Sequence, residues 1–428
     1  MRAIVVFAVV SVLLLPARPG AAQGIPGSLT LSDALTLAAS RNPSFAAARD
    51  AIEVVQGARA EAARRPNPAL TFESQAFESN RRQLPDTGGR EFSVRFDQEL
   101  ELGGRRGLRI AAADATVRAT ESRAQNRLRQ LELEVKRAYL QAVLATADRA
   151  VAQTSLDEID RVLGVSRARF QQGEISGAEL RRLQVERLRF VDDVFAAELA
   201  LRNARSALLA LIGAPDLGQP VAVVELLAPA GPPPGTPVQP IALAGPALVA
   251  RALAARADVS AARQEVVRTE TETRLQRALR SPAPTVGGGY KRDFSGSAVM
   301  FGVTIPVPLF NSLNAGSVAR AEAEQRRAAN EAAATELVVR LDVQQAANAL
   351  AINQERVAYI EREYLNPARE SRDIAAAAYR IGAADLIDFL DAQRALRDTA
   401  RTYNRALYES RVSVFELEAA VGEPNRQE

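Results

Sequence analysis

The sequence contains one structural plan twice, and this internal duplication restricts the fold of the 428-residue chain more than any other feature. Shifting the chain on itself by 209 residues places RFQQGEISGAELRRLQ (169–184) over AYRIGAADLIDFLDAQ (378–393). Further upstream the best shift is 214 residues, which places NPALT (67–71) over SPAPT (281–285). A repeat of this kind indicates a supersecondary unit that packs against its own copy.

The N-terminus reads as a signal for export. Arg2 is followed by the apolar run AIVVFAVVSVLLL (3–15) and by a small-residue cleavage site after Ala22. The run is too short to cross a bilayer as a helix. The sequence therefore predicts a signal peptide at 1–22, a first structural repeat at 23–213, a proline-rich connector at 214–246, a second structural repeat at 247–422 and a C-terminal tail at 423–428.

Each repeat follows the order helix, β-hairpin, long helix, glycine turn, helix. The first is expected to have its hairpin at about 68–100, its long helix at about 104–171 and its last helix at about 174–213. The second is expected to have them at about 283–308, 312–381 and 384–421. Residues 104–171 contain no proline, and as one helix they would span about 100 Å. This helix has apolar rows on two faces, which predicts a neighbour on each side and hence a helical wall or cylinder.

Composition excludes most catalytic chemistry. The chain has no Cys, His or Trp, so thiol nucleophiles, Cys/His zinc sites and an imidazole base are excluded. Loss of the signal peptide leaves acidic and basic residues almost balanced, which does not fit a nucleic-acid binder. We predict a protein that is not an enzyme and has no cofactor, no metal site and no nucleic-acid partner.

Alternating apolar residues mark the expected strands. They are typical of strands that cross a membrane, although a soluble hairpin with one buried face would look the same. Export and the presence of two hairpins favour the membrane. Four strands cannot close a barrel, and an open sheet edge is not tolerated in lipid, so such a chain has to oligomerise. The residues expected to face lipid are Phe92, Val94, Phe96, Phe301, Val303 and Ile305.

The order and spacing of several motifs carry a family resemblance. NPALTFE, LELGGRRGLRI, ARFQQG, AYRIG and LIDFLDAQ, together with the duplication, resemble the TolC-like outer-membrane efflux factor family. The resemblance implies an α+β membrane protein in which long antiparallel coiled-coil helices form a periplasmic tunnel. Each protomer would contribute four strands to a trimeric 12-stranded β-barrel in the outer membrane of a Gram-negative bacterium. The segment ELGGRR (101–106) is similar to the heavy-metal cation-efflux branch of this family.

The stretch after the second glycine turn holds three carboxylates, Asp385, Asp388 and Asp391. An enzyme site would need a partner base or metal, which the sequence does not supply, and a solvated helix face is the simplest alternative. A third interpretation starts from Gly173 and Gly382, which are expected to end the long helices at a tip. Asp388 and Asp391 are three residues apart and so share a helix face, and in a trimer each would form a ring of three.

The resemblance assigns further roles at this tip. It implies that Asp388, Asp391 and the apolar Ile387 constrict the closed periplasmic end. It also implies that Tyr379 belongs to a latch with Glu179 as its acidic partner, next to the tip residues Phe170, Gly173 and Gly382. The basic partner expected two residues after the second tip glycine is replaced by Ala384, and Arg181 or Arg182 is the candidate substitute.

The function predicted from the sequence is a passive outer-membrane exit channel of a tripartite efflux system. As the resemblance implies, its partners would be two further copies of the chain, outer-membrane lipid, a periplasmic adaptor (membrane fusion) protein and an inner-membrane efflux pump of the RND type. One alternative is a duct for type I protein secretion. Another, from a different class, is a periplasmic helical scaffold or adhesin stalk whose hairpins are soluble.

Overall fold

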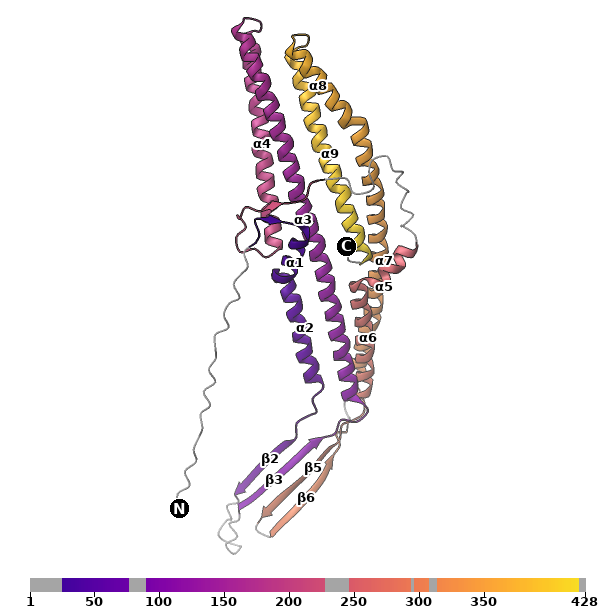
Figure 1. Ribbon diagram of the computed structural model, residues 1–428. Coiled ribbons are helices and arrows are strands. Elements are labelled where there is room, and N and C mark those ends of the chain that lie inside the picture. The colour runs from indigo at the N-terminus through magenta and orange to yellow at the C-terminus, as the bar shows by residue number, and fades with distance from the viewer. Residues whose placement is uncertain (1–24, 77–89, 228–245, 294–295, 308–313, 423–428) are drawn as a thin grey trace, which may run out of the picture.

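The computed structural model describes residues 25–76, 90–227, 246–293, 296–307 and 314–422. It is elongated, with helical hairpins at one end and a small β-sheet at the other (Figure 1). The expected signal peptide, C-terminal tail and most of the connector lie outside the described residues.

The elements follow the same order in both halves of the chain. The first half contains β1 (Ser28–Leu29), α1 (Leu31–Arg41), α2 (Pro43–Ala62), β2 (Ala69–Ala76), β3 (Arg90–Glu99), α3 (Arg105–Gln171), α4 (Gly177–Leu211) and β4 (Ala222–Val223). The second contains α5 (Pro246–Ala255), α6 (Ala257–Ala278), β5 (Thr285–Asp293), β6 (Gly296–Thr304), α7 (Ala315–Ile360), η1 (Glu361–Leu365), α8 (Asn366–Arg380) and α9 (Leu386–Val421).

Helix α3 is the element around which the others are arranged. It runs for 67 residues without interruption, as its lack of proline allows. It packs against α2 and α4 of its own repeat and against α6 and α9 of the other repeat. The helices therefore form a curved wall with the order α4, α3, α9, α8 near the tips and α2, α3, α6, α7 near the sheet (Figure 1).

The second repeat departs from the single helix expected at about 312–381. Its long helix consists of α7, the π-helical turn η1 and α8. The cause lies in Pro367, which has no N–H and whose ring would clash with the carbonyl four residues earlier in an α-helix. The backbone N–H of Asn366 instead bonds to the carbonyl of Glu361, five residues back.

The sheet joins the two hairpins in the order β2-β3-β5-β6, with all pairs antiparallel. Residues directly opposite each other share a face, so the register places Leu70, Phe96, Gly288 and Phe301 in one row. The next row contains Phe72, Val94, Tyr290 and Val299. The opposite face carries polar side chains, including the ion pairs Arg95–Asp97 and Lys291–Glu91.

Five of the six side chains expected to face lipid thus lie along one apolar face, and Ile305 follows directly after β6; not all are equally exposed. Phe301 is 87% exposed, and Phe96, Val303 and Ile305 are exposed as well. Phe92 and Val94 are half-buried, and the ring of Phe92 lies 6.0 Å from that of Tyr290. Strands β2 and β6 form the two edges of the sheet and have no further partner strand in the described chain.

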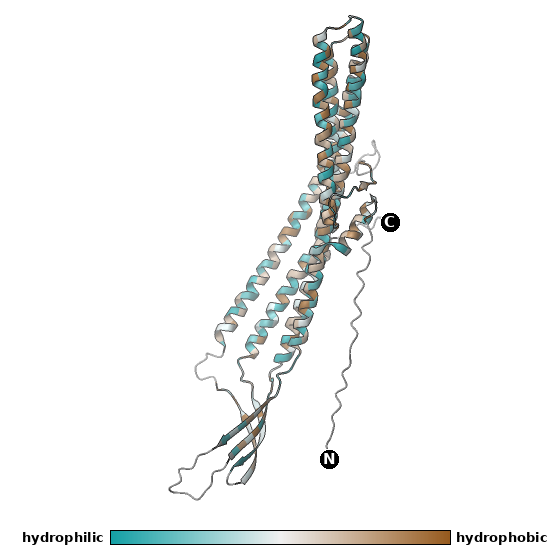
Figure 2. Cartoon of the chain, turned by 90° about the vertical axis from the view of Figure 1, so that its left-hand side faces the viewer, coloured by the Kyte–Doolittle hydropathy of each residue, from teal (hydrophilic) through white to brown (hydrophobic). Residues whose placement is uncertain are grey.

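Hydrophilic and hydrophobic residues are interleaved along all the long helices (Figure 2). Within the described ranges, no helix combines the length and the apolar character that a bilayer crossing requires.

Both repeats have the same joint at mid-length, at the boundary between a short helix and the longer helix that follows it. In the first repeat, Asn42 is buried at the break between α1 and α2, and its Nδ2 donates to the carbonyl of Leu211 at 2.8 Å. In the second repeat, Arg256 is buried at the break between α5 and α6, and its Nη1 donates to the carbonyl of Ala420 at 3.3 Å. These pairs are related by the shifts of 214 and 209 residues found in the sequence. The joint closes each repeat by tying the end of its last helix to its first helix break.

Glycine is required at the end of each of these last helices. Gly213 has φ +71° and Gly422 has φ +81°, a left-handed conformation that L side chains rarely adopt. A Cβ at Gly213 would lie 2.6 Å from the carbonyl oxygen of Arg41, and one at Gly422 would lie 2.9 Å from Cγ of Arg256.

Replacing Gly213 by alanine should therefore lower the free energy of unfolding by about 2 kcal/mol or more, because backbone strain and steric overlap add. The measurement is thermal unfolding in detergent, followed by circular dichroism at 222 nm. The matched control is Gly164→Ala inside α3, where an added Cβ meets nothing within 4 Å and should stabilise by about 0.5–1 kcal/mol. Equal melting temperatures for the two variants would show that the joint does not depend on Gly213.

Candidate functional site at the helical tips

The two helical hairpins end in matching glycine turns. Gly173 follows α3 with φ +78° and Gly382 follows α8 with φ +77°. In both turns the glycine N–H bonds to a carbonyl three residues back, and the next N–H bonds to a carbonyl five residues back. This is the hydrogen-bond pattern of a helix that ends in a left-handed residue. It places the following residues of α4 and α9 at one end of the molecule (Figure 1).

A buried apolar cluster joins the two hairpins beneath these turns. Helix α3 contributes Ile159, Val162 and Leu163 to it, and α4 contributes Leu183 and Phe190. Tyr379 of α8 and Leu386, Phe389 and Leu390 of α9 complete the cluster. The closed packing of the tips therefore depends on contacts between the two repeats.

Tyr379 carries the polar part of this contact. Its side chain is 1% exposed, and its hydroxyl donates to Oε1 of Glu179 at 3.2 Å. The hydroxyl also lies 2.9 Å from Oγ of Ser166. A phenol has one proton, so the serine donates and the tyrosine accepts. Burial raises the pKa of Tyr379 above its ordinary value, and the Glu179 carboxylate adds to the increase, so the phenol remains a neutral donor. We call Tyr379, Glu179, Ser166 and Arg169 the tip clasp.

Arg169 provides the basic partner that sequence reasoning did not find. Its Nη1 donates to the carbonyl of Tyr379 at 3.1 Å, and its guanidinium lies 5.7 Å from the centre of the tyrosine ring. Its Nε also pairs with Glu174 at 3.1 Å. Ala384 cannot act in this way, and neither of the proposed substitutes, Arg181 and Arg182, has a hydrogen bond or ion pair within the described residues. The sequence does show that Arg169 is a basic residue close to a tip glycine, four residues before Gly173. It also shows that the second repeat has no counterpart, because the aligned residue is Ala378.

Asp388 and Asp391 lie on the same side of α9, as their spacing predicts. Both are exposed and line an open groove of about 680 Å³ between α8 and α9, together with Glu370. Asp391 is not free, because its Oδ1 accepts from Nη1 of Arg394 at 3.1 Å. The same arginine also contacts Glu186 of α4, so it bridges the two hairpins.

The remaining residues expected at the tip lie around this core. Ile387 and Phe170 are each 44% exposed. The Phe170 ring approaches the start of α4, where a Cβ on Gly177 would lie 3.5 Å from it. Asp385 is the residue before α9 and makes no side-chain hydrogen bond to the helix end.

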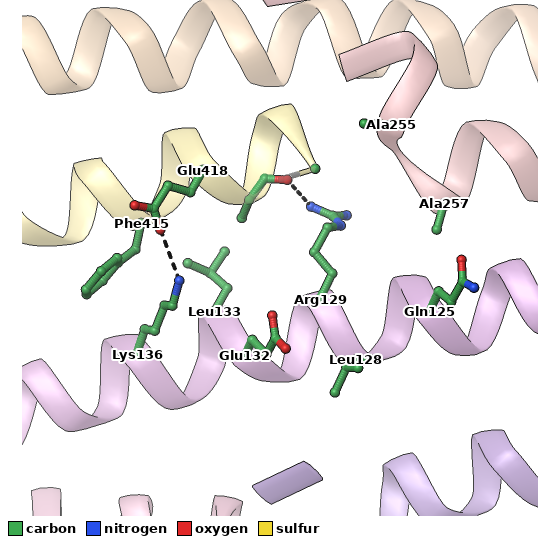
Figure 3. Close-up of a pocket in the computed structure, with 12 residues that line it drawn as sticks. Gln125, Leu128, Arg129, Glu132, Leu133, Lys136, Ala255, Ala257, Phe415 and Glu418 are labelled. Atoms are coloured by element: carbon green, nitrogen blue, oxygen red, sulfur yellow. Dashed lines mark hydrogen bonds and ion pairs between the residues drawn. The ribbon is translucent and has the colours of Figure 1, made fainter. Parts of the chain in front are cut away.

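A second hollow, of about 350 Å³, lies between α3 and the end of α9 (Figure 3). Lys136 points towards Glu418 and pairs with it at 3.0 Å, and Arg129 donates to the carbonyl of Ala419 at 2.6 Å. Burial raises the pKa of Glu132 and lowers that of Arg129. These pairs connect the first repeat to the second, and they brace the wall close to the Arg256 joint.

A duplicated helical wall attached to a four-stranded sheet with one apolar face defines a channel-type outer-membrane protein. The family model described as outer membrane efflux protein matches this chain twice, at residues 34–214 and 248–423. The chain therefore belongs to the outer membrane efflux protein family, and it is an efflux channel of the outer membrane that extends into the periplasm. The two matched segments also coincide with the duplicated halves of the sequence.

Individual relatives agree with this assignment. The cobalt-zinc-cadmium resistance protein CzcC of Cupriavidus metallidurans is 26% identical over 374 residues, covering 86% of this chain and 84% of the relative. Among solved structures, CusC superposes with a TM-score of 0.77 at 18% identity, covering 92% of both chains. VceC of Vibrio cholerae superposes with a TM-score of 0.76 at 17% identity, covering 92% of this chain and 96% of VceC. The family favours the efflux channel over the secretion duct and the periplasmic scaffold.

Replacing Tyr379 by phenylalanine should weaken the tip clasp. The change removes the bonds to Glu179 and Ser166 but keeps the ring stacked on Phe389 at a centroid distance of 6.0 Å. Two lost hydrogen bonds cost about 1–3 kcal/mol, so the channel should show higher conductance and more frequent openings in planar bilayers. Tyr408→Phe is the control, because the half-buried Tyr408 has no side-chain hydrogen bond among the described residues. If both variants conduct like the wild type, the clasp does not hold the tip closed.

Proposed function

We propose that three copies of this chain form a passive exit channel whose closed end is the ring of helical tips. The observation that carries this proposal is the position of Asp388 and Asp391, exposed on one side of α9 directly beside a buried contact between hairpins. A change in that contact would move the carboxylates. Energy for transport would come from the inner-membrane pump, since the chain offers no catalytic set of its own.

The sheet supports assembly from several copies. Its apolar face suits lipid and its polar face suits a water-filled lumen. Strands β2 and β6 are free edges, and backbone groups at an open edge have no partner in lipid. Pairing β6 of one copy with β2 of the next satisfies both edges, and three copies give the 12-stranded barrel.

The helical wall supports the same closure. Its outer flanks near the tips are α4 on one side and α7–α8 on the other. Exposed apolar residues follow a heptad spacing along the α4 flank at Val185, Leu188, Phe195 and Leu199. The other flank exposes Ile352, Tyr359, Tyr364 and Ile374. In a closed ring these two flanks meet, which covers both apolar rows.

The cargo we propose is divalent metal cations, which the relative CzcC, a cobalt-zinc-cadmium resistance protein, suggests. Rings of carboxylates favour cations, and the absence of His and Cys from the sequence means that softer metal ligands would not retain them. A periplasmic adaptor protein and an inner-membrane pump of the RND type would deliver the cations to the tips.

Removing the two aspartates should abolish the charge selectivity of the closed end. We expect Asp388→Asn/Asp391→Asn to reduce the cation-over-anion permeability ratio severalfold in planar bilayers and to remove block by multivalent cations. The control is Asp50→Asn/Glu53→Gln, which removes two exposed carboxylates with the same spacing from α2. Unchanged selectivity in the aspartate variant, or an equal change in the control, would contradict the aperture assignment.

The sheet faces can be compared at neighbouring positions. Val303→Arg places a charge on the apolar face and Thr304→Arg places one on the polar face. In lipid the first should be destabilising, by less than the about 2–4 kcal/mol of a midplane position because Val303 lies near the end of β6, so it should reduce the yield of heat-resistant trimer in outer-membrane fractions, whereas the second should not. If both variants assemble equally well, the apolar face does not contact lipid.

A further inference from the structure

The apolar face of the sheet carries one charged side chain, that of Arg292. The register places Arg292 in a row with Ser74, Phe92 and Ser297, next to the row that contains Tyr290. Residues two apart along a strand share a face, so Arg292 lies on the same face as Tyr290. No other charged residue occurs in this row, in the two apolar rows described above or in the row of Gln98, Val286 and Val303.

Arg292 also differs from nearby basic residues in having no partner. Lys291, the residue before it, points to the polar face and pairs with Glu91. Arg95 lies on the polar face as well and pairs with Asp97 at 2.9 Å. Arg292 is exposed, and within the described residues it has neither an ion pair nor a hydrogen bond. An unpaired charge beside hydrocarbon is unfavourable, so a negative group close to Arg292 would lower the free energy of this face in a membrane.

The length of the strands places Arg292 at the outer boundary of the apolar band. The helices lie at the opposite end of the sheet (Figure 1), and they extend into the periplasm, so the row of Arg292 lies on the external side. Along the first hairpin, Leu100 and Phe92 are eight residues apart, which is about 27 Å of extended chain. With a strand tilt of about 40° the height is about 20 Å, close to the band of about 25 Å that faces lipid in such proteins. Arg292 shares the row of Phe92 and therefore lies at the level of the outer headgroups.

The surroundings of Arg292 suit a lipid that carries phosphate. Ser297 is exposed and directly opposite Arg292 on β6, and opposite side chains are close enough to donate to the same phosphate. Tyr290, 40% exposed, occupies the next row inward, as tyrosines do at membrane interfaces. Val299 and Phe301 follow on β6 and are more exposed still, which provides apolar surface for acyl chains. A polar end and an apolar track are thus continuous on one face.

We propose that Arg292 and Ser297 bind the phosphate of a glycolipid in the outer leaflet, with its acyl chains along the apolar face of β5 and β6. The group we infer is a phosphate monoester. It carries about −1.5 to −2 charges at neutral pH and three acceptor oxygens, and a planar guanidinium binds it through two hydrogen bonds. This inference rests on the proposed channel function and names a lipid partner for its sheet, with one site in each copy.

The test counts lipids bound to the purified trimer by native mass spectrometry. The probes are diphosphorylated lipid A, the same lipid without its phosphates, and phosphatidylglycerol, which is a phosphodiester. Arg292→Gln removes the charge, and Arg292→Lys keeps the charge but not the planar fork. The matched control is Lys291→Gln, which removes a basic residue one position away on the polar face.

We expect the wild-type trimer to bind diphosphorylated lipid A more tightly than either other probe. Arg292→Gln should weaken this binding about tenfold or more, because a charge-assisted hydrogen bond to phosphate is lost. Arg292→Lys should have intermediate affinity, and Lys291→Gln should bind like the wild type. Equal affinity of the wild type and Arg292→Gln, or an equal loss in Lys291→Gln, would overturn the site. Equally tight binding of phosphatidylglycerol, or of the lipid without phosphates, would overturn the assignment of a phosphate monoester.

Assembly and conductance separate this inference from the channel itself. Arg292→Gln should form heat-resistant trimer and conduct like the wild type in planar bilayers, because Arg292 lies on the face away from the lumen. If the variant assembles, conducts and still binds lipid A as the wild type does, only the lipid site fails. If the wild-type protein forms no conducting trimer, the proposed channel fails, and the lipid site fails with it.

Discussion

The free edges of the four-stranded sheet are the constraint on which the rest of the proposed assembly depends. Strands β2 and β6 leave rows of backbone N–H and C=O groups unpaired, and in lipid each unpaired group costs several kcal/mol. In the proposed assembly, pairing these edges between copies would fix how neighbouring chains sit and would bring the helices into a ring. The α4 flank of one copy would then face the α7–α8 flank of the next. Closure at the tips would thus be a consequence of edge pairing at the opposite end of the molecule.

Because of the duplication, the two halves of the helical wall are built alike at mid-length, whereas their two tips carry different residues. The mid-length joint is present in both repeats, with Asn42 in the first and Arg256 in the second. At the tips the repeats have separate roles. The first supplies Ser166, Glu179 and Arg169, and the second supplies Tyr379 and the paired aspartates. The clasp is therefore made from unlike halves of the duplicated chain.

Sequence reasoning found what depends on local pattern. The absence of proline located α3, alternation located the strands, and the two glycines located the turns. It also placed Tyr379 and Glu179 together, through a family resemblance. It missed Arg169, because the position of this residue near the first tip glycine does not show that its side chain reaches a carbonyl 210 residues away. It did not identify the pair between Asp391 and Arg394, and it overlooked the effect of Pro367 on the helix. The Arg169 contact depends on which helix lies beside which, and a single sequence does not contain that information. Arg394, three residues after Asp391, and Pro367 are local signals that the sequence does contain.

The strength of the clasp limits how the channel can be opened. Each copy has two hydrogen bonds at the Tyr379 hydroxyl and one from Arg169 to its carbonyl. At a net value of about 0.5–1.5 kcal/mol per bond, the three copies of the proposed trimer would hold the tips closed with about 5–14 kcal/mol. A partner that binds with micromolar affinity provides about 8 kcal/mol, which lies inside this range. In the proposed trimer, binding of a periplasmic partner would therefore be comparable in free energy with the clasp, whereas burying several more apolar side chains along α8, as α3 does, would raise the free energy needed to open it.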